Sequence, residues 1–258
     1  MAALFFGPST QQLYGVLESP SGRPRKTGVL LLQPGLQEYM RSHWAFRSLA
    51  GALAARGFPT LRFDYRGTGD SAGEPEATSF EACVDDARVA AEELRDAGMV
   101  QDVTLIGMRL GAAIALRAAQ KLAFAKRLLL WNPIVTGRAY LAELEQMDRA
   151  LRLQLLHGLR GPEGELAGYR FPAPVRDSIA RLDLERDFDA KPPRRIEIFI
   201  ESADTPPAIA ALAASLERAG HTVKSHRVAS SEPAAFPDAA LLAQEAIRAL
   251  VARAEAAE

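Results

Sequence analysis

The sequence predicts an α/β protein built on a doubly wound, mostly parallel sheet, and two observations support that prediction. Short apolar runs alternate with longer stretches whose apolar residues recur at helical spacing. A repeated strand–helix rhythm of this kind implies right-handed crossovers between parallel strands. The rhythm pauses over residues 137–193, which predicts an insertion in an otherwise continuous fold.

Local signals predict the elements of the first half of the chain. Residues 13–18 have the pattern of an edge strand, which a Ser-Pro-Ser-Gly turn closes. Thr78 and Glu81 fit a capping box at the start of a helix, and Gly98 is its expected stop. The predicted elements are strands 29–32, 60–63, 103–106 and 127–131 and helices 43–57, 78–97 and 110–122.

The second half holds the insertion and the remaining core elements. Residues 137–193 are interpreted as a helical cap, because an amphipathic helix near 140–155 and a shorter one near 176–188 need a surface to cover. The α/β core is then expected to comprise residues 1–136 and 194–258. Its last elements are predicted as strand 196–200, helix 207–219, strand 223–228 and helix 239–254.

Composition describes an ordinary globular chain. Its 258 residues are 48% hydrophobic and 24% charged, and a net charge of −1 gives no basic surface for nucleic acid or an acidic membrane. The one cysteine, Cys83, excludes an internal disulfide and is interpreted as a buried small residue. No signal peptide is apparent, and no apolar stretch approaches the roughly 18 residues of a membrane helix. We therefore expect a cytoplasmic protein without a cofactor or metal.

The central motif is Val-Thr-Leu-Ile-Gly-Met-Arg-Leu-Gly-Ala at residues 103–112. An apolar run stops at Gly107, Gly111 follows four residues later, and an alanine-rich helical stretch begins there. A strand, a tight turn that needs glycines and a helix form the nucleophile elbow, G-x-S-x-G, of the α/β-hydrolase fold. Arg109 stands between the glycines in place of Ser, Cys or Asp. The motif predicts a sheet of the α/β-hydrolase type but supplies no nucleophile.

The chain resembles bacterial α/β hydrolases of the serine-aminopeptidase-like group, especially those labelled exosortase-associated hydrolases. The resemblance spans nearly the whole chain. Its most specific part is Leu-Arg-Phe-Asp-Tyr-Arg-Gly-Thr-Gly-Asp-Ser at residues 61–71, which looks like the family's D-x-R-G-x-G-x-S loop after its fourth strand. The order of strand, elbow, cap insertion and acid-bearing strand also matches. The resemblance implies a Ser–His–Asp triad served by an oxyanion hole.

Carried over position by position, the resemblance implies a degenerate triad. The nucleophile position is Arg109, and the acid position after the strand that follows the cap is Asp204. The base should be a histidine in the loop at about 230–238, and that loop contains none. One of the three triad members therefore remains.

The resemblance also implies the oxyanion side of the site. Gln33 stands where many relatives carry the histidine of their oxyanion motif, and the backbone amides of Leu36 and Leu110 match the two oxyanion donors. Trp131 and Asn132 lie at a strand end that faces the expected crevice, where pocket lining and core packing are both open. The expected pocket residues are Gln33, Gly35, Met108, Trp131 and Asn132.

Two interpretations of Arg109 stay open. A cation just before a helix N-terminus is unfavourable, and a buried unpaired guanidinium costs several kcal/mol, so an anion should accompany it. In the first interpretation the anion is Asp204, which forms a structural ion pair with Arg109. In the second, Arg109 holds a bound anionic ligand.

The other polar candidates are interpreted as structural. Gly67 and Gly69 serve the turn geometry of the 64–71 loop. His43 is expected to pack against Trp44 in a helix, with a base at the pocket mouth as the alternative. The remaining histidines lack metal-ligand spacing and are expected to be surface or hydrogen-bonded residues: His157, His221 and His226.

Three functions fit a site without Ser and His, whose loss from a triad costs on the order of 10⁶ in kcat. The first is a non-hydrolytic binding or interaction protein, a pseudoenzyme with an anion-accepting pocket at Arg109. Its partner would be a small anionic or acyl ligand, another protein or a second copy of the chain, but not nucleic acid or a membrane. The second is an enzyme acting on a small carboxylate, ester or acyl thioester by non-triad chemistry. The third, a hydrolase with a relocated nucleophile at Ser71 or Ser230, is the least favoured.

Overall fold

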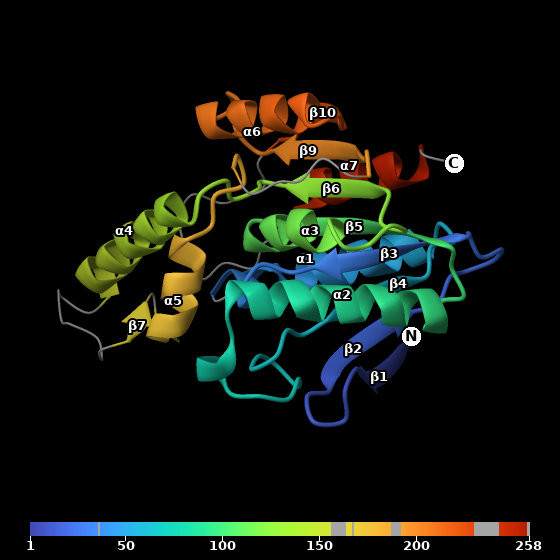
Figure 1. Cartoon of the computed structure of the whole chain (residues 1–258), viewed down its shortest axis with the longest axis horizontal. Coiled ribbons are helices and arrows are strands. Elements are labelled where there is room, and N and C mark those ends of the chain that lie inside the picture. Colours follow the sequence, from blue (N-terminus) through green and yellow to red (C-terminus); the bar gives the residue numbers. More distant parts are fainter. Residues whose placement is uncertain (36, 156–163, 167, 187–191, 230–242, 257–258) are drawn as a thin grey trace.

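The computed structural model describes residues 1–35, 37–155, 164–166, 168–186, 192–229 and 243–256, with an eight-stranded sheet at its centre (Figure 1). The strand order is β1-β2-β4-β3-β5-β6-β9-β10. The β1–β2 and β2–β4 pairs are antiparallel and the other five pairs are parallel, which confirms the predicted fold class. The strands are β1 (Ala2–Phe6), β2 (Leu13–Glu18), β3 (Thr27–Leu32), β4 (Thr60–Phe63), β5 (Asp102–Met108), β6 (Arg127–Trp131), β9 (Arg195–Ile200) and β10 (Thr222–Arg227).

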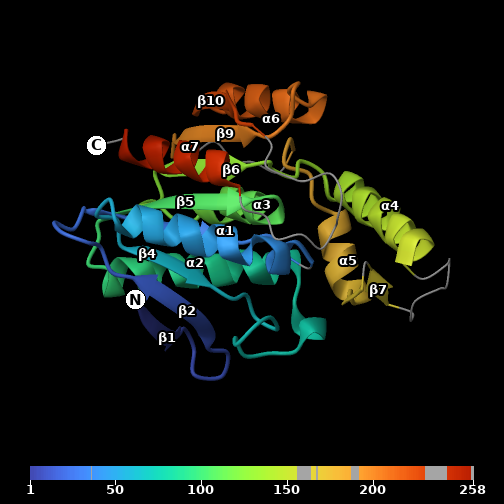
Figure 2. The ribbon, with the colours of Figure 1, turned by 180° about the vertical axis from the view of Figure 1, so that it is seen from behind.

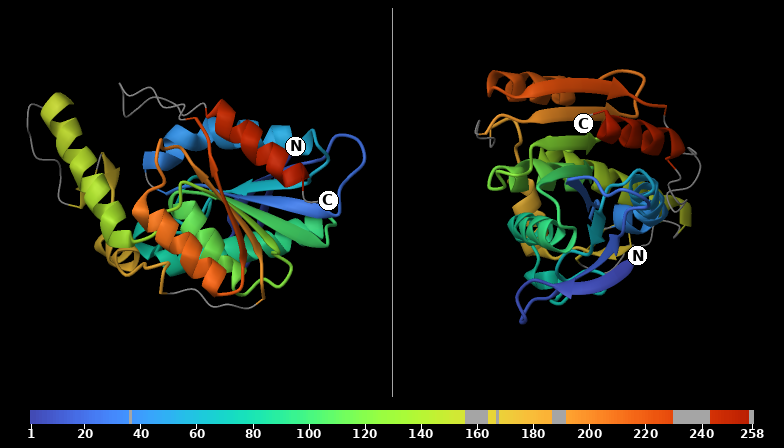
Figure 3. Two further views of the ribbon diagram at one scale, coloured as in Figure 1. Left: turned by 90° about the horizontal axis from the view of Figure 1, so that it is seen from above. Right: turned by 90° about the vertical axis from the view of Figure 1, so that its right-hand side faces the viewer.

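The central strands are almost continuously apolar because helices cover both faces of the sheet. One face carries α1 (Gln37–Ala54) and α7 (Gln244–Glu255), and the other carries α2 (Phe80–Ala97), α3 (Leu110–Ala119) and α6 (Pro207–Arg218) (Figures 1 and 3). A separate apolar core fills each interface between sheet and helices. None of the described helices is long and apolar enough to cross a membrane.

The edge of the sheet differs from the prediction. Residues 13–18 form β2, which lies between β1 and β4 and is therefore not an edge strand. The edge strand on this side is β1, in which all five residues are apolar although only Phe6 is buried, so its sequence does not show the alternation of a half-buried strand. Strands β4 and β6 have the predicted bounds.

The capping prediction for α2 is wrong by one residue. Ser79 is the N-cap, and its Oγ accepts a hydrogen bond from the Ala82 amide at 3.0 Å. Thr78 is unavailable as a cap because its hydroxyl donates to the Arg66 carbonyl at 3.0 Å. The helix ends where predicted, with Gly98 as its C-cap.

The described part of the insertion lies beyond the ends toward which the parallel strands point (Figures 1 and 2). It contains α4 (Gly137–Leu155), a hairpin of β7 (Glu165–Leu166) and β8 (Tyr169–Arg170), and α5 (Ala173–Ala180). The short helix η1 (Pro75–Ala77) belongs to the core and lies between β4 and α2 in the chain. Gly137 packs so closely on the return of the chain that a Cβ there would lie 1.6 Å from the Ile179 carbonyl oxygen. The role of the insertion as a cap over the sheet remains a prediction.

Candidate functional site

The elbow joins β5 to α3, with Arg109 at its tip. Arg109 has φ 53° and ψ −117°, a conformation that costs a non-glycine residue on the order of 1–3 kcal/mol. The flanking glycines are required by space, because a Cβ on Gly107 would lie 2.3 Å from the Gly111 carbonyl oxygen. A Cβ on Gly111 would lie 2.1 Å from the Leu32 carbonyl oxygen. The strained turn of a nucleophile elbow is thus formed around an arginine.

The Arg109 side chain joins three separate elements. Its Nε donates to Oε1 of Glu38 on α1 at 2.8 Å, and its Nη2 donates to Oε1 of Glu143 on α4 at 2.5 Å. The Tyr140 hydroxyl donates to the second oxygen of Glu38 at 2.9 Å. The guanidinium carbon lies 5.5 Å from the centre of the Tyr140 ring, within the range of a cation–π contact. We call these four residues the elbow cluster.

Burial and charge divide the elbow cluster into an inner and an outer half. The side chains of Arg109 and Glu38 are 19% and 14% exposed, whereas that of Glu143 is 60% exposed. Burial by itself would lower the pKa of Arg109, but the two carboxylates raise it above its ordinary value. Burial and the neighbouring Glu38 raise the pKa of Tyr140. Arg109 is therefore charged, and Tyr140 neutral, at neutral pH.

The predicted pairing of Arg109 with Asp204 is wrong. Asp204 follows β9 and is exposed, while the guanidinium meets Glu38 and Glu143. Those two carboxylates flank the elbow from α1 and α4, so the arginine does not need the acid position for charge balance. Sequence reasoning missed both partners because they lie 71 and 34 residues away along the chain. The one local signal was the helical spacing of Tyr140 and Glu143 on α4.

The oxyanion side is described in part. Leu36, one of the two implied amide donors, lies outside the described residues. Leu110, the other, is the first residue of α3 and is buried. Gln33 is also buried, with its Nε2 donating to the Phe63 carbonyl at 3.3 Å and its backbone oxygen accepting from Tyr65. Its Oε1 has no hydrogen-bond partner among the described residues.

The residues predicted to line a pocket at the end of β6 pack in the core or form hydrogen bonds between loops. Trp131 is completely buried and stacks on Phe46 at 6.5 Å, so it belongs to the core rather than to a pocket. Its side chain points to the α1 face because a strand alternates its faces, which an all-apolar strand sequence does not reveal. Asn132 exchanges two 2.9 Å hydrogen bonds with Glu201, one to its carboxylate and one from its amide. Met108 is buried at the end of β5.

A cavity of about 360 Å³ lies between the core and the insertion. Gly35 and the first turns of α1 form one wall, and the 64–71 loop, the β7–β8 hairpin and α5 form the rest. The Tyr39 hydroxyl donates to Asp64 Oδ1 at 2.7 Å, and burial together with Asp64 raises its pKa. The lining is mostly apolar or aromatic: Pro34, Gly35, Tyr39, Met40, Tyr65, Gly67, Thr68, Gly69, Pro75, Thr78, Tyr169, Arg170, Pro172 and Val175.

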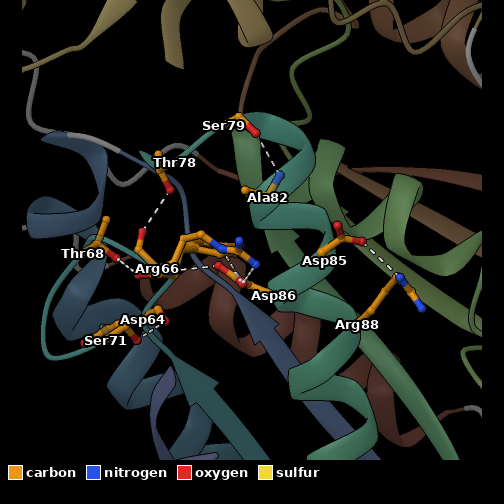
Figure 4. A network of polar contacts seen from close by, with 11 residues as sticks. Asp64, Arg66, Thr68, Ser71, Thr78, Ser79, Ala82, Asp85, Asp86 and Arg88 are labelled. Atoms are coloured by element: carbon orange, nitrogen blue, oxygen red, sulfur yellow. Dashed lines mark hydrogen bonds and ion pairs between the residues drawn. The ribbon is translucent and has the colours of Figure 1, made fainter. Parts of the chain in front are cut away.

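The 64–71 loop is held by hydrogen bonds within the core (Figure 4). Asp64 Oδ2 accepts from the Asp70 amide at 3.1 Å, and Arg66 reaches Asp86 at 2.6 and 2.9 Å. The Ser71 hydroxyl donates to the Asp64 carbonyl at 2.5 Å and accepts from the Tyr14 amide at 2.9 Å. Ser71 is thus buried and fully engaged, which argues against a relocated nucleophile there. Ser230 lies outside the described residues, as does the loop expected to hold a base.

The histidines and the cysteine have structural surroundings. His43 packs edge-to-face on Trp44 at 5.9 Å, as expected. His221 accepts the Arg194 amide at 3.0 Å, and burial lowers its pKa. Burial raises the pKa of the Cys83 thiol to about 12, so it is not a thiolate at neutral pH. His157 lies outside the described residues, within which no three His, Cys, Asp or Glu side chains are grouped to hold a metal ion.

Comparisons with known proteins agree on the fold. A family model described as serine aminopeptidase, S33, matches residues 24–217. Est1E from Butyrivibrio proteoclasticus with bound ferulic acid superposes with a TM-score of 0.65 at 17% identity, over 98% of this chain and 97% of that chain. DcsB in complex with its substrate analogue gives 0.70 at 15% identity, over 99% and 97%. Mouse alpha/beta hydrolase domain-containing protein 10 gives 0.61 at 16% identity, over 99% and 98%. None of the curated proteins matches the sequence.

Proposed function

The chain belongs to the serine aminopeptidase S33 family of α/β hydrolases, and we propose that it is a non-hydrolytic member, a binding or interaction protein. The observation that carries this proposal is the residue at the elbow. Arg109 occupies the nucleophile position, and its side chain is engaged by Glu38 and Glu143. A guanidinium cannot act as the nucleophile of acyl transfer, because it stays protonated in proteins.

The elbow cluster supports a different task for this position. Arg109 contacts α1 through Glu38 and α4 through Glu143, so it connects the core to the insertion across the place where a substrate acyl group would sit. The inner pair is largely withdrawn from water, and a second hydrogen bond from Tyr140 holds Glu38 in place. In this proposal Arg109 fixes the position of α4 through Glu38 and the Tyr140 hydroxyl, and the exposed contact with Glu143 is not needed for it.

The ligand is proposed to bind in the neighbouring cavity. Its volume of about 360 Å³ lies in the range of small-molecule sites. Three tyrosines, Met40 and Val175 give it apolar walls, and Arg170 stands at the hairpin side. An aromatic or short acyl ligand with an anionic end matches such walls, because the ring or chain replaces water against apolar surface.

The anionic end of that ligand is proposed to take the place of Glu143 on Arg109. Glu143 is 60% exposed, so its contact with Nη2 is screened by solvent and contributes little. The contact of Nε with Glu38 is mostly buried and is proposed to stay. A ligand carboxylate can therefore exchange for Glu143 without leaving Arg109 unpaired.

The first experiment tests for hydrolysis. Purified protein should not react with a fluorophosphonate probe and should cleave p-nitrophenyl acetate no faster than its Arg109→Ala variant. An Arg109→Ser variant restores a hydroxyl at the elbow but no histidine base, so it too should stay inactive, and an unrelated serine hydrolase with an intact triad is the positive control. Turnover on the order of 1 s⁻¹ that disappears on replacing one serine would contradict the proposal. Turnover that survives every serine replacement would favour the non-triad enzyme.

The second experiment tests for anion binding. Benzoate is the probe, with binding followed by calorimetry. Glu143→Gln removes the internal competitor and should bind benzoate several-fold more tightly than the parent protein. Glu145→Gln is the matched control, since it lies on the same helix and pairs with Arg176 rather than Arg109. Equal benzoate affinity in the two variants would place the anionic end elsewhere.

A further inference from the structure

A second group of charges is buried in the sheet, toward the end of the strands opposite the elbow. Glu197 on β9 is completely buried, and four cationic or ionisable groups surround its carboxylate. Oε1 accepts a hydrogen bond from Arg127 and forms an ion pair with Arg195 Nε at 3.1 Å. Oε2 contacts Arg253 at 2.6 Å and His226 Nε2 at 2.8 Å. We call these five residues the Glu197 cluster.

The Glu197 cluster holds more positive than negative charge. Three arginines face one carboxylate, which leaves two positive charges when His226 is neutral. Burial alone would raise the pKa of Glu197, but hydrogen bonds from Arg127 and Arg253 lower it to about 2. The Ala254 carbonyl near the C-terminus of α7 accepts from Arg127 at 3.3 Å, and a helix end supplies roughly half a negative charge. More than one positive charge is still left over.

A cavity of about 220 Å³ lies against this cluster. The first residues of four neighbouring strands line it: Thr27, Asp102, Arg127 and Arg195. Arg127 and Arg195 stand opposite one another in the register of β6 and β9, and one carboxylate oxygen, Oε1 of Glu197, is shared between these two like charges. Lys126 also lines the cavity, but Asp102 neutralises it at 2.8 Å.

One donor in this cavity wall lacks a partner. The Arg127 side chain is 7% exposed, and its Nε has no hydrogen-bond partner among the described residues. A buried donor left unsatisfied costs about 1–3 kcal/mol. The Thr104 side chain shares the wall and lies beside Arg127 in the register of β5 and β6, so its hydroxyl is a further donor.

We propose that this cavity binds a phosphate-class oxyanion against Arg127 and Arg195, which both line it. A dianion matches the excess charge of the Glu197 cluster, and its oxygens suit the forked N–H groups of arginine. The ligand is either inorganic phosphate or the phosphoryl group of a small molecule. The cavity lies at the start of β5 and Arg109 follows its end, a separation of about 20 Å. The two sites are therefore independent, and this inference does not rest on the proposed function.

Phosphate-dependent stability is the test. Inorganic phosphate should raise the melting temperature saturably at constant ionic strength, because it binds the folded state only. Arg195→Gln should weaken phosphate binding about tenfold or more, since one charge-assisted contact is lost. Arg195 is partly exposed, and Glu197 keeps its other partners, so this variant is expected to fold. Arg88→Gln is the control, because Arg88 pairs with Asp85 on α2, on the other face of the sheet.

A second variant gives an independent readout. Thr104→Asp places a carboxylate beside Arg127 and should abolish the phosphate response while raising the melting temperature without phosphate. Glycerol 3-phosphate separates the two sources: tighter binding than phosphate indicates a phosphorylated small molecule, and equal binding indicates the free ion. The inference is overturned if phosphate stabilises the protein no more than chloride, or if Arg195→Gln responds like Arg88→Gln.

Discussion

The two ion clusters lie at opposite ends of the parallel strands and have opposite charge imbalances. At the elbow one cation, Arg109, meets two carboxylates. At the other end of the strands one carboxylate, Glu197, meets three arginines and a histidine. The elbow cluster joins separate parts of the fold and is open to solvent on one side. The Glu197 cluster ties β6, β9, β10 and α7 together within the core.

The difference shows how burial sets what a charge can do. Glu197 has no access to water, so removing one of its partners leaves charge that water cannot compensate in a poorly polarisable interior. Glu143 exchanges its contact with Arg109 for water at little cost. The Glu197 cluster therefore determines stability, and the contact of Glu143 with Arg109 suits reversible contact with a ligand or with the insertion. Variants of the Glu197 cluster should therefore lose more unfolding free energy than variants of the elbow cluster.

The largest effect is expected from Glu197→Gln. Removing this charge leaves three arginines close together without a carboxylate, and breaking a buried ion pair costs about 3–5 kcal/mol. Urea denaturation monitored by circular dichroism measures the change. Asp85→Asn is the matched control, because Asp85 is exposed and pairs with Arg88 at 3.1 Å. A loss for Glu197→Gln no greater than that of the control would mean that this cluster does not hold the strands together.

Acid should act through the same carboxylate. The pKa of Glu197 is lowered from 4.5 to about 2, so its contribution to stability is complete above about pH 4.5. That contribution is lost as the pH falls toward 2, because the unfolded chain binds the proton first. The parent protein should lose its stability advantage over Glu197→Gln across this interval in urea titrations at successive pH values. A constant difference between the two proteins from pH 5 to pH 3 would contradict the lowered pKa.

An intermediate effect is expected from Arg109→Ala. The variant leaves the mostly buried Glu38 without its cation, but the Tyr140 hydroxyl still donates to Glu38. A cost of about 1–3 kcal/mol follows from an incompletely satisfied buried group. Combining Arg109→Ala with Glu38→Ala should cost less than the sum of the two single changes, since contacting residues are energetically coupled. Strict additivity would show that the elbow pair carries no net interaction.

The sequence predicts the fold well because the signals for strands and helices are local. β4 alternates polar and apolar residues, β6 is apolar after its first residue, and the bounds of both agree with the prediction. The N-cap of α2 shifted by one residue because Thr78 is taken by a hydrogen bond to a residue twelve positions earlier. The missed strand β1 is mostly exposed, so burial leaves no periodic pattern in it.

The site is predicted less completely, because its contacts are long-range. The elbow follows from Gly107 and Gly111, whose spacing is a local requirement of the turn. The need of Arg109 for an anion also follows from simple electrostatics. Which carboxylate meets it depends on how α1 and α4 are placed around the elbow, and this cannot be derived from spacing along the chain. The Glu197 cluster has the same origin, since four separate elements contribute to it.

The smallest effect is expected from Glu143→Gln, and it distinguishes the outer half of the elbow cluster from the inner half. Glu143 is 60% exposed, so its contact with Arg109 should contribute no more than about 0.5 kcal/mol to unfolding free energy. Glu38→Gln removes a carboxylate that accepts from both Arg109 and Tyr140, so we expect it to cost at least twice as much. Salt should separate them as well, because 0.5 M NaCl screens an exposed pair far more than a buried one. Denaturation of both variants in low and high salt gives the comparison. If Glu143→Gln proved as costly as Glu38→Gln, the contact with α4 would be a structural lock, and a ligand could not displace it.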